Sequence, residues 1–472
     1  MRIMAFCPEF RMITNGRISF WYADIGGPPP VRPSLPGDME ADVCIIGAGY
    51  TGLWSAYYLK QLQPELRIVV LEREFAGFGA SGRNGGWLSG GFAWAHERYL
   101  GAGGRVGVQA MIRAMATSVD EVIRVLAQEG IAADLVRTDE LQVATCAAQW
   151  QRVQADFRAR RAWGVAEDAC ELLDAARLGE RIRVADARGA LMTRHVARVQ
   201  PARLVQGLAR VVEARGVRIF EQTTVTGFRA GRVQTHRGRV KADCILRATE
   251  GFTAGLPGLQ RSWLPLNSAQ IVTEPLPESL WEQIGWQGQE LLGDCAHAYC
   301  YAQRTREGRI AMGGRGVPYR FGSRTDVRGR TQPATISALL AILHRHFPMT
   351  RGLAIDHAWC GVLGVPRDWC ASVGLDRKTG IGWAGGYVGV GVSTSNLAGR
   401  TLAELVLGQD TERTHLPWVN HRVRDWEPEP LRWLGVHAMY RLYHLADRLE
   451  RRGGGTSGTS VLARLANRLT GR

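Results

Sequence analysis

Hydrophobic residues follow two kinds of pattern along the chain, and these patterns predict its strands and helices. Short, mainly apolar runs, the pattern of buried strands, occur at 43–46, 68–71, 217–220, 244–246 and 381–384. Helical periodicity occurs at 105–130, 149–164, 336–347 and 397–407, and in the segment that Pro201 opens. Strands and helices therefore alternate in the first and last parts of the chain, which indicates an α/β fold.

The middle of the chain follows a different pattern. Between 268 and 316, apolar and polar residues alternate and break at turns. Antiparallel strands are expected there at 270–273, 298–302 and 309–312, and a hairpin is expected around Gly231 and Gly238. The proline-rich stretch 1–40 predicts an irregular lead-in. The expected fold class is thus α/β and α+β, with an antiparallel sheet between α/β segments.

Residues 41–72, ADVCIIGAGYTGLWSAYYLKQLQPELRIVVLE, carry the most specific motif. Gly47 allows a tight turn, Gly49 lets the backbone approach a pyrophosphate, and Gly52 lets the helix pack closely on the sheet. The helix N-terminus offers unpaired N–H groups to phosphates. Glu72 ends the second strand, where a carboxylate accepts hydrogen bonds from a ribose diol and disfavours a 2′-phosphate. Together these features predict a dinucleotide site.

Composition limits the classes of partner. A chain of 472 residues accommodates two or three domains. The net charge of +15 invites a nucleic-acid or membrane interpretation, but lysine occurs only at 60, 241 and 378, and charges of both signs are interspersed. General basicity is therefore favoured and no nucleic-acid partner is expected. An RNA-linked flavoprotein stays open as an alternative class, which steeply salt-dependent RNA binding would support.

Cysteine usage and hydropathy bear on the compartment. The nine cysteines form no CxxC pair and do not suggest a disulfide framework, so a reducing compartment is expected. The N-terminus lacks the apolar core of a signal peptide, and no apolar run is long enough for a membrane span. A cytoplasmic protein without a metal site is expected.

Two further glycine-rich segments accompany the dinucleotide motif. These are Gly77–Gly86, GFGASGRNGG, and Gly385–Gly391, GGYVGVG, the latter followed by Asn396-Leu-Ala-Gly-Arg400. With the GAGYTG and LERE segments, they resemble the D-amino-acid-oxidase family of FAD-dependent oxidoreductases. Within that family, the loop 77–86 and the lead-in Phe20-Trp-Tyr are most similar to γ-glutamylputrescine oxidoreductases. The resemblance spans roughly residues 20–450.

The resemblance implies a domain organisation. An FAD-binding Rossmann-like domain is assembled from the separated segments 41–95, 196–262 and 352–410. A substrate-binding domain with an antiparallel sheet is built from 96–195 and 263–351. The lead-in 1–40 precedes them, and a C-terminal helical segment and tail, 411–472, follows.

The resemblance also implies FAD as cofactor, held by the three loops and neighbouring strand ends. Open N–H groups of such glycine loops suit oxygen acceptors, and a helix opening near residue 396 would stabilise negative charge on the reduced flavin. The cofactor-binding residues implied are Gly47, Gly49, Tyr50, Thr51, Gly52, Glu72, Arg73, Ala80, Ser81, Arg83, Asn84, Gly85, Gly86, Val225, Ala248, Thr249, Gly361, Gly386, Tyr387, Val388, Gly389, Val390 and Gly391.

The resemblance implies an activity as well. Members of the family pass a hydride from the carbon beside a neutral amine to flavin N5, and the imine then hydrolyses; oxygen or another acceptor reoxidises the flavin. The cofactor carries the difficult step, so no catalytic side chain is assigned. His297 is a conceivable proton acceptor, although an isolated histidine is usually structural.

The segment Trp359–Pro366 bears on the substrate. Leu363 stands where amino-acid-oxidising relatives carry an arginine that clamps the substrate carboxylate, and an apolar residue makes no such contact. This favours a small amine or acylated polyamine over an N-methyl or α-amino acid, which remains the alternative enzyme substrate. Val390 similarly stands where relatives often carry a polar residue. A plain NAD-binding dehydrogenase is a further alternative.

Five side chains, one of them the Tyr387 already named, are candidates for roles beside the cofactor. Cys360 lies six residues before Pro366, where sarcosine-oxidase-like relatives carry a cysteine bonded to the flavin, but a buried structural cysteine fits the sequence equally. Candidate walls of the substrate pocket, which can bind a cation or simply be core, are Trp87, Tyr301, Trp359 and Tyr387.

Overall fold

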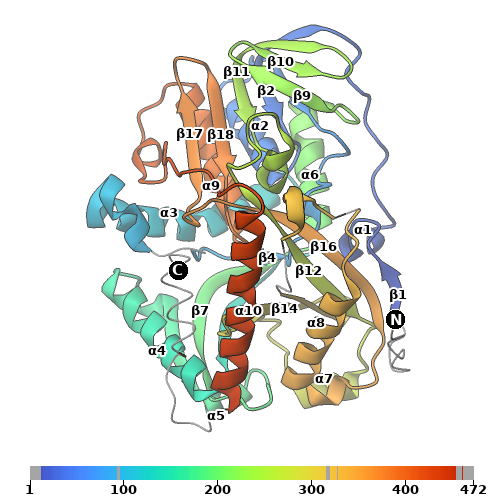
Figure 1. Cartoon of the computed structure of the whole chain (residues 1–472), viewed down its shortest axis with the longest axis vertical. Coiled ribbons are helices and arrows are strands. Elements are labelled where there is room, and N and C mark those ends of the chain that lie inside the picture. Colours follow the sequence, from blue (N-terminus) through green and yellow to red (C-terminus); the bar gives the residue numbers. More distant parts are fainter. Residues whose placement is uncertain (1–11, 93–95, 315–318, 327, 453–459, 461–472) are drawn as a thin grey trace.

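The computed structural model describes residues 12–92, 96–314, 319–326, 328–452 and 460, which form two large sheets (Figure 1). We call the eight-stranded one the Rossmann-like sheet and the other the ten-stranded sheet. Among the described residues, no helix combines the length and apolarity needed to cross a bilayer.

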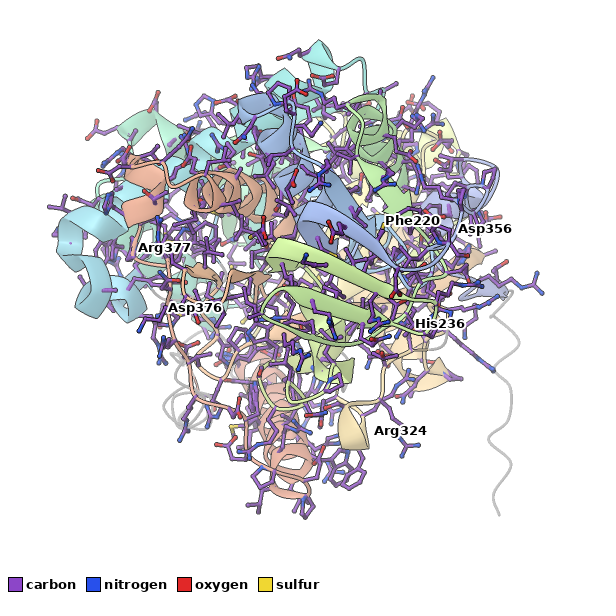
Figure 2. The ribbon with its side chains drawn as sticks, turned by 90° about the horizontal axis from the view of Figure 1, so that it is seen from above. Phe220, His236, Arg324, Asp356, Asp376 and Arg377 are labelled. Carbon is purple, nitrogen blue, oxygen red and sulfur yellow. The ribbon has the colours of Figure 1, made fainter. Side chains whose placement is uncertain are left out.

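The Rossmann-like sheet has the order β17-β18-β11-β2-β3-β8. Its strands are β17 (Ser372–Asp376), β18 (Ile381–Gly385), β11 (Arg239–Arg247), β2 (Met39–Ile46), β3 (Ile68–Leu71) and β8 (Arg218–Phe220), with β9 (Val225–Arg229) and β10 (Arg232–Thr235) attached to β11. The strands from β18 to β8 are parallel. Seen from above, Phe220 and Asp376 mark the two edges of this sheet (Figure 2).

Helices from three parts of the chain cover one face of this sheet. They are α2 (Tyr50–Leu62), α3 (Leu100–Gln128), α6 (Pro201–Ala214) and α9 (Gly391–Val406). Their apolar faces share one core with the strand residues that point toward them, such as Val43, Ile45 and Val70. The helices α2 and α9 pack closely, since a Cβ atom on Gly399 would lie 2.6 Å from Trp54 Cβ.

The ten-stranded sheet is mainly antiparallel and has the order β1-β16-β12-β15-β14-β13-β5-β7-β4, with β6 beside β7. Its strands are β1 (Met12–Asn15), β4 (Trp87–Leu88), β5 (Val136–Ala144), β6 (Cys170–Asp174), β7 (Gly189–Arg198), β12 (Leu264–Thr273), β13 (Leu291–Asp294), β14 (Cys300–Arg304), β15 (Ile310–Gly314) and β16 (Ile355–Val365).

The remaining helices lie on and around this second sheet. They are α1 (Phe20–Ala23), α4 (Ala147–Ala162), α5 (Ala175–Gly179), α7 (Glu278–Ile284), α8 (Pro333–His346) and α10 (Leu431–Arg452). A second core lies between α7, α8 and one face of the sheet. The helix α10 crosses the front of the lower half of the molecule (Figure 1).

The fold confirms the mixed α/β and α+β expectation but changes two details. The lead-in is not irregular throughout, because β1 pairs with β16, and Phe20, Trp21 and Tyr22 are buried against Trp359 and Phe75. The helix expected near residue 396 already begins at Gly391. In the first turn of this helix, the Thr394 hydroxyl donates to the Val390 carbonyl.

The expected segment boundaries also differ from the observed sheets. The strand β16 lies in the ten-stranded sheet although 352–410 was expected to belong to the Rossmann-like domain, and β4 joins it too. Conversely, α3 packs its apolar side on α9 as well as on β7 of the ten-stranded sheet. The strand with which each strand pairs decides the sheet to which it belongs, and a local sequence pattern does not reveal that partner.

Candidate functional site

One cleft brings the three glycine-rich segments together at the carboxyl ends of β2, β3, β11 and β18, where ligands bind in doubly wound sheets. Its empty volume, counted out to solvent, is about 1280 Å³. The residues expected from the sequence that line it are Gly47, Gly49, Tyr50, Thr51, Glu72, Arg73, Ala80, Ser81, Asn84, Val225, Ala248, Thr249, Tyr387, Gly389 and Gly391.

The first loop requires its glycines. Gly47 has φ +104°, and a Cβ atom there would lie 2.6 Å from the Ala248 carbonyl oxygen. A Cβ atom on Gly52 would lie 2.0 Å from the Gly47 carbonyl oxygen, so Gly52 acts behind the cleft, where α2 meets the loop. Gly49 is the N-cap of α2, and the next N–H, that of Tyr50, donates to Ser81 Oγ at 2.8 Å. Residue 81 thus joins the second loop to the first.

Glu72 lies at the end of β3 and lines the cleft with its carboxylate partly engaged. Its two oxygens accept from the N–H groups of Ala48 at 2.9 Å and Glu74 at 3.0 Å. Burial raises the pKa of Glu72, and these two N–H donors oppose the rise. A carboxylate has about four acceptor positions, so this group retains capacity for further donors such as ribose hydroxyls.

Glu250 also lines the cleft, and sequence reasoning did not assign it a role. Its Oε1 accepts from the N–H groups of Gly386 and Tyr387, both at 3.0 Å, and its Oε2 accepts from Gly364 N–H. Burial raises its pKa to about 7, against the effect of these donors and of Arg247. Glu250 therefore fastens the third glycine loop to β16. Its position directly after Ala248 and Thr249 was the available signal.

Several expected cofactor residues do not line the cleft: Gly52, Arg83, Gly85, Gly86, Gly361, Gly386, Val388 and Val390. Arg83 differs most from expectation, because the residue is 1% exposed and its side chain pairs with Asp326 at 2.7 Å. It also donates to the Phe78 carbonyl and lies over the Phe78 ring, 4.3 Å from the centroid. In the structure this buried guanidinium connects the second glycine loop to the segment that carries Asp326.

The four aromatic candidates divide into three environments. Tyr387 lines the cleft, and its hydroxyl lies 2.9 Å from Thr51 Oγ1. Trp87 and Tyr301 form an edge-on pair on the ten-stranded sheet, 6.1 Å between centroids. Trp359 is fully buried, donates to the Arg83 carbonyl and packs edge-on to Trp21. It lies in the core and does not line the cleft.

Cys360 and His297 also lie away from the cleft lining. The Cys360 thiol donates to the Arg330 carbonyl at 3.5 Å within the core of the ten-stranded sheet, and burial raises its pKa to about 12. The His297 ring lies 3.0 Å from Glu450 Oε1 and stacks on Tyr443. It fastens α10 to the sheet.

Leu363 lines the cleft together with Val362. Among the described residues that line it, Arg73 is the one basic residue, and it follows Glu72 on the loop after β3. Leu363 and Val362 are thus the apolar residues that β16 contributes to this lining, beside the carboxylate of Glu250.

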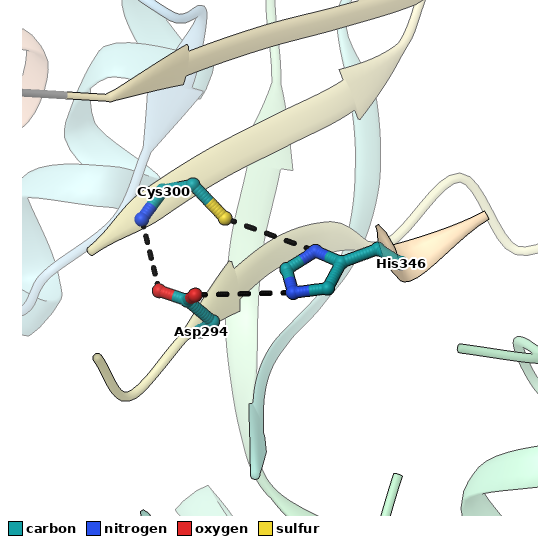
Figure 3. A group of neighbouring side chains, drawn as sticks. All are labelled: Asp294, Cys300 and His346. Carbon is teal, nitrogen blue, oxygen red and sulfur yellow. Dashed lines mark hydrogen bonds and ion pairs between the residues drawn. The ribbon is translucent and has the colours of Figure 1, made fainter. Parts of the chain in front are cut away.

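A separate cluster of Asp294, Cys300 and His346 lies in the core of the ten-stranded sheet (Figure 3). Asp294 accepts from Cys300 N–H at 2.9 Å, and its other oxygen lies 3.8 Å from His346 Nε2. Burial raises the Asp294 pKa to about 6 and lowers the His346 pKa to about 3. The histidine is thus held neutral, and the cluster ties β13 and β14 to the end of α8 outside the cleft.

Comparison with known proteins identifies the class. The model of the family described as FAD dependent oxidoreductase (DAO) matches residues 42–405, and the chain belongs to this family. It is 29% identical to gamma-glutamylputrescine oxidoreductase of Escherichia coli, over 80% of this chain and 86% of the relative. The probable oxidoreductase OrdL of Haemophilus influenzae is 26% identical, over 80% and 85%. Glycine oxidase from Geobacillus kaustophilus superposes with a TM-score of 0.69 at 20% identity, over 82% of this chain and 99% of that one.

The family confirms the expected cofactor and enzyme class. The chain is an FAD-dependent oxidoreductase. The match also decides against the plain NAD-binding dehydrogenase.

Proposed function

We propose that this cleft binds FAD and that the enzyme oxidises the C–N bond of a small amine or acylated polyamine. The cleft fits the cofactor because it combines a glycine cradle with a carboxylate at the end of β3. A Cβ atom on Gly47 would lie 2.6 Å from the Ala248 carbonyl oxygen, so only glycine fits at this turn. Without side chains, the backbone N–H groups of the loop can approach a phosphate. Gly49 and the N-terminus of α2 supply those donors, and Glu72 suits the ribose hydroxyls.

Two further groups of residues would hold the rest of the cofactor. Val225, which begins β9, and Ala248 and Thr249, which follow β11, line the cleft and suit the adenine. Gly389 and Gly391 precede and open α9, so the positive end of that helix faces the cleft. This end would stabilise negative charge on the pyrimidine part of the reduced isoalloxazine.

The substrate class is supported by one observation above all, the apolar lining at Leu363. Binding a free α-amino acid requires a cationic partner for its carboxylate, and bidentate arginine contacts are the strongest of that kind. The described lining has its basic residue, Arg73, beside Glu72 instead. An uncharged substituent next to the reacting carbon fits the leucine.

The protein itself binds the substrate, orients it and excludes water from it. Bound FAD supplies the acceptor for the two electrons and the hydrogen that leave the carbon beside the amine. The substrate reacts as the neutral amine, since a protonated nitrogen has no lone pair to form the C=N bond, and water then releases an aldehyde and an amine or ammonia. Apolar residues such as Leu363 and Val362 favour the neutral form by excluding water. Oxygen, or another acceptor, takes the electrons afterwards.

Anaerobic titration tests this proposal directly. The purified enzyme is mixed with a panel of monoamines, diamines, polyamines, acylated polyamines, N-methyl amino acids and α-amino acids, and loss of the flavin absorbance is followed. Bleaching by amines that carry no carboxylate supports the proposal. Bleaching that depends on a carboxylate next to the reacting carbon would overturn it. The variant Leu363→Arg should then shift activity toward carboxylate-bearing amines, with Leu363→Met as the volume-matched control.

A further inference from the structure

A row of register-matched residues crosses the ten-stranded sheet on the face opposite α8. Gln142 pairs with Gly293, Gly293 with Tyr301, Tyr301 with Gly313, and Gly313 with Gln270. Their sequence neighbours Leu141, Leu292, Ala302 and Met312 belong to the core against α8. Because side chains alternate along strands, the row points away from that core.

The two glycines of the row make room for aromatic rings. A Cβ atom on Gly293 would lie 3.3 Å from the Trp87 ring, and one on Gly313 would lie 2.3 Å from the Tyr301 ring. Both rings are only half-buried, and they meet edge-on, 6.1 Å between centroids. The Tyr301 hydroxyl lies 3.2 Å from Ser268 Oγ. The row therefore carries an aromatic surface with polar groups beside it.

Glu140 stands on the same face of β5 as Gln142, two positions away. Its carboxylate accepts from Ser89 Oγ at 2.8 Å and from Gln142 Nε2 at 3.1 Å, and the residue is 6% exposed. Among the residues whose positions are described, no Lys, Arg or His nitrogen lies within 4.0 Å of this carboxylate. A buried carboxylate with neutral donors alone is costly unless a cation joins it.

Hydrogen bonds connect Glu140 to the cofactor cleft. Ser89, whose hydroxyl donates to Glu140, accepts through its carbonyl from Ser393 Oγ. Ser393 lies in the first turn of α9, between Val392 and Ser395, which both line the cleft. Ser89 thus connects the Glu140 carboxylate to Ser393, at the end of α9 that faces the cleft.

We propose that Glu140, with the rings of Trp87 and Tyr301, binds a second, positively charged amine of the substrate, away from the C–N bond that is oxidised. The substrate class is then a diamine or polyamine. The carboxylate supplies the counter-charge, and the electron-rich ring faces supply cation–π attraction. This inference rests on the proposed function, since it concerns the same substrate.

The test compares α,ω-diamines with monoamines of equal chain length. The wild-type enzyme should have a lower KM for each diamine than for its matched monoamine. In Glu140→Gln, KM for diamines should rise about 10- to 100-fold, the effect of removing one partner of a buried charge pair. KM for monoamines and kcat for both should change little. Glu140→Asp, which keeps the charge, should retain part of the diamine preference.

The controls separate binding from structure. Glu282→Gln makes the same chemical change at an exposed position on α7 and should leave both KM values unchanged. A purely structural Glu140 would alter monoamine and diamine kinetics alike, together with the melting temperature, and this would overturn the inference. Amine oxidation without any diamine preference in the wild type would also overturn it and leave the proposed function standing. Bleaching by α-amino acids alone would reject both.

Discussion

The hydroxyl groups of Thr51 and Tyr387 lie 2.9 Å apart and join the first and third glycine-rich loops across 336 positions of sequence. Thr51 lies in the first turn of α2, and Tyr387 lies between β18 and α9. Both line the same cleft. The hydrogen bond therefore closes the contact between two segments that would hold opposite parts of the cofactor.

Removing this hydrogen bond should weaken both fold and cofactor binding. We expect Tyr387→Phe to lower the free energy of unfolding by about 1–2 kcal/mol, because the buried Thr51 hydroxyl loses its partner. Urea denaturation followed by flavin fluorescence measures this loss. A double-mutant cycle with Thr51→Val isolates the pair, and a coupling energy near zero would contradict the assignment.

Gly47 should tolerate no side chain. The variant Gly47→Ala combines a φ of +104° with a Cβ placed 2.6 Å from the Ala248 carbonyl oxygen, so the loop must move away from the cleft. We expect the purified protein to lack most of its flavin absorbance. Gly37→Ala is the matched control, since nothing lies within 4 Å of its added Cβ. Full flavin occupancy in Gly47→Ala would refute the cradle.

Glu250 should make stability depend on pH. Its pKa is raised from 4.5 to about 7 in the folded chain, so the folded state binds more protons between these values than the unfolded state. The free energy of unfolding should therefore fall, by about 1–3 kcal/mol, as pH rises through this window. Glu250→Gln cannot titrate and should lose that slope, whereas Glu282→Gln should keep it. Urea midpoints at several pH values between 4.5 and 8 provide the measurement.

The buried ion pair of Arg83 and Asp326 should be costly to break. Their side chains are 0% and 1% exposed, and their atoms lie 2.7 Å apart. Asp326→Asn should reduce the free energy of unfolding by about 3–5 kcal/mol, because it leaves the guanidinium buried without a counter-charge. The double variant Arg83→Met/Asp326→Leu should recover part of this loss. Equal destabilisation by both variants would contradict a charge effect.

The flavin should be released by denaturation. The Cys360 thiol lies in the core against α8, where it donates a hydrogen bond to the Arg330 carbonyl. It does not line the cleft. Acid precipitation of the purified enzyme should leave all flavin in the supernatant, and Cys360→Ala should keep wild-type flavin content. Flavin remaining with the precipitate would show a covalent link.

Sequence reasoning succeeded where neighbours along the chain decide the geometry. The roles of Gly47, Gly49 and Gly52 as backbone spacers follow from one turn between a strand and a helix, and the structure reproduces that turn. The α/β and antiparallel segments could likewise be predicted, because periodicity is local.

It failed where a partner far along the chain decides the outcome. Arg83 was expected to face the cofactor, but Asp326, 243 positions away, binds it in the core. The bonds of Glu250 to Gly364 and Gly386 depend in the same way on where β16 and the third loop meet β11. Trp359 and Tyr387 are equally aromatic, and only packing separates the core residue from the cleft residue.

The strand β16 has a mechanical consequence. Its eleven residues begin beside β1 and end at Val365, past Gly364, which Glu250 grips together with the third glycine loop. One continuous strand therefore connects the ten-stranded sheet to the third glycine loop, and it opposes a hinge motion between them. We therefore expect the ten-stranded sheet and the third glycine loop to keep their relative position while the enzyme turns over.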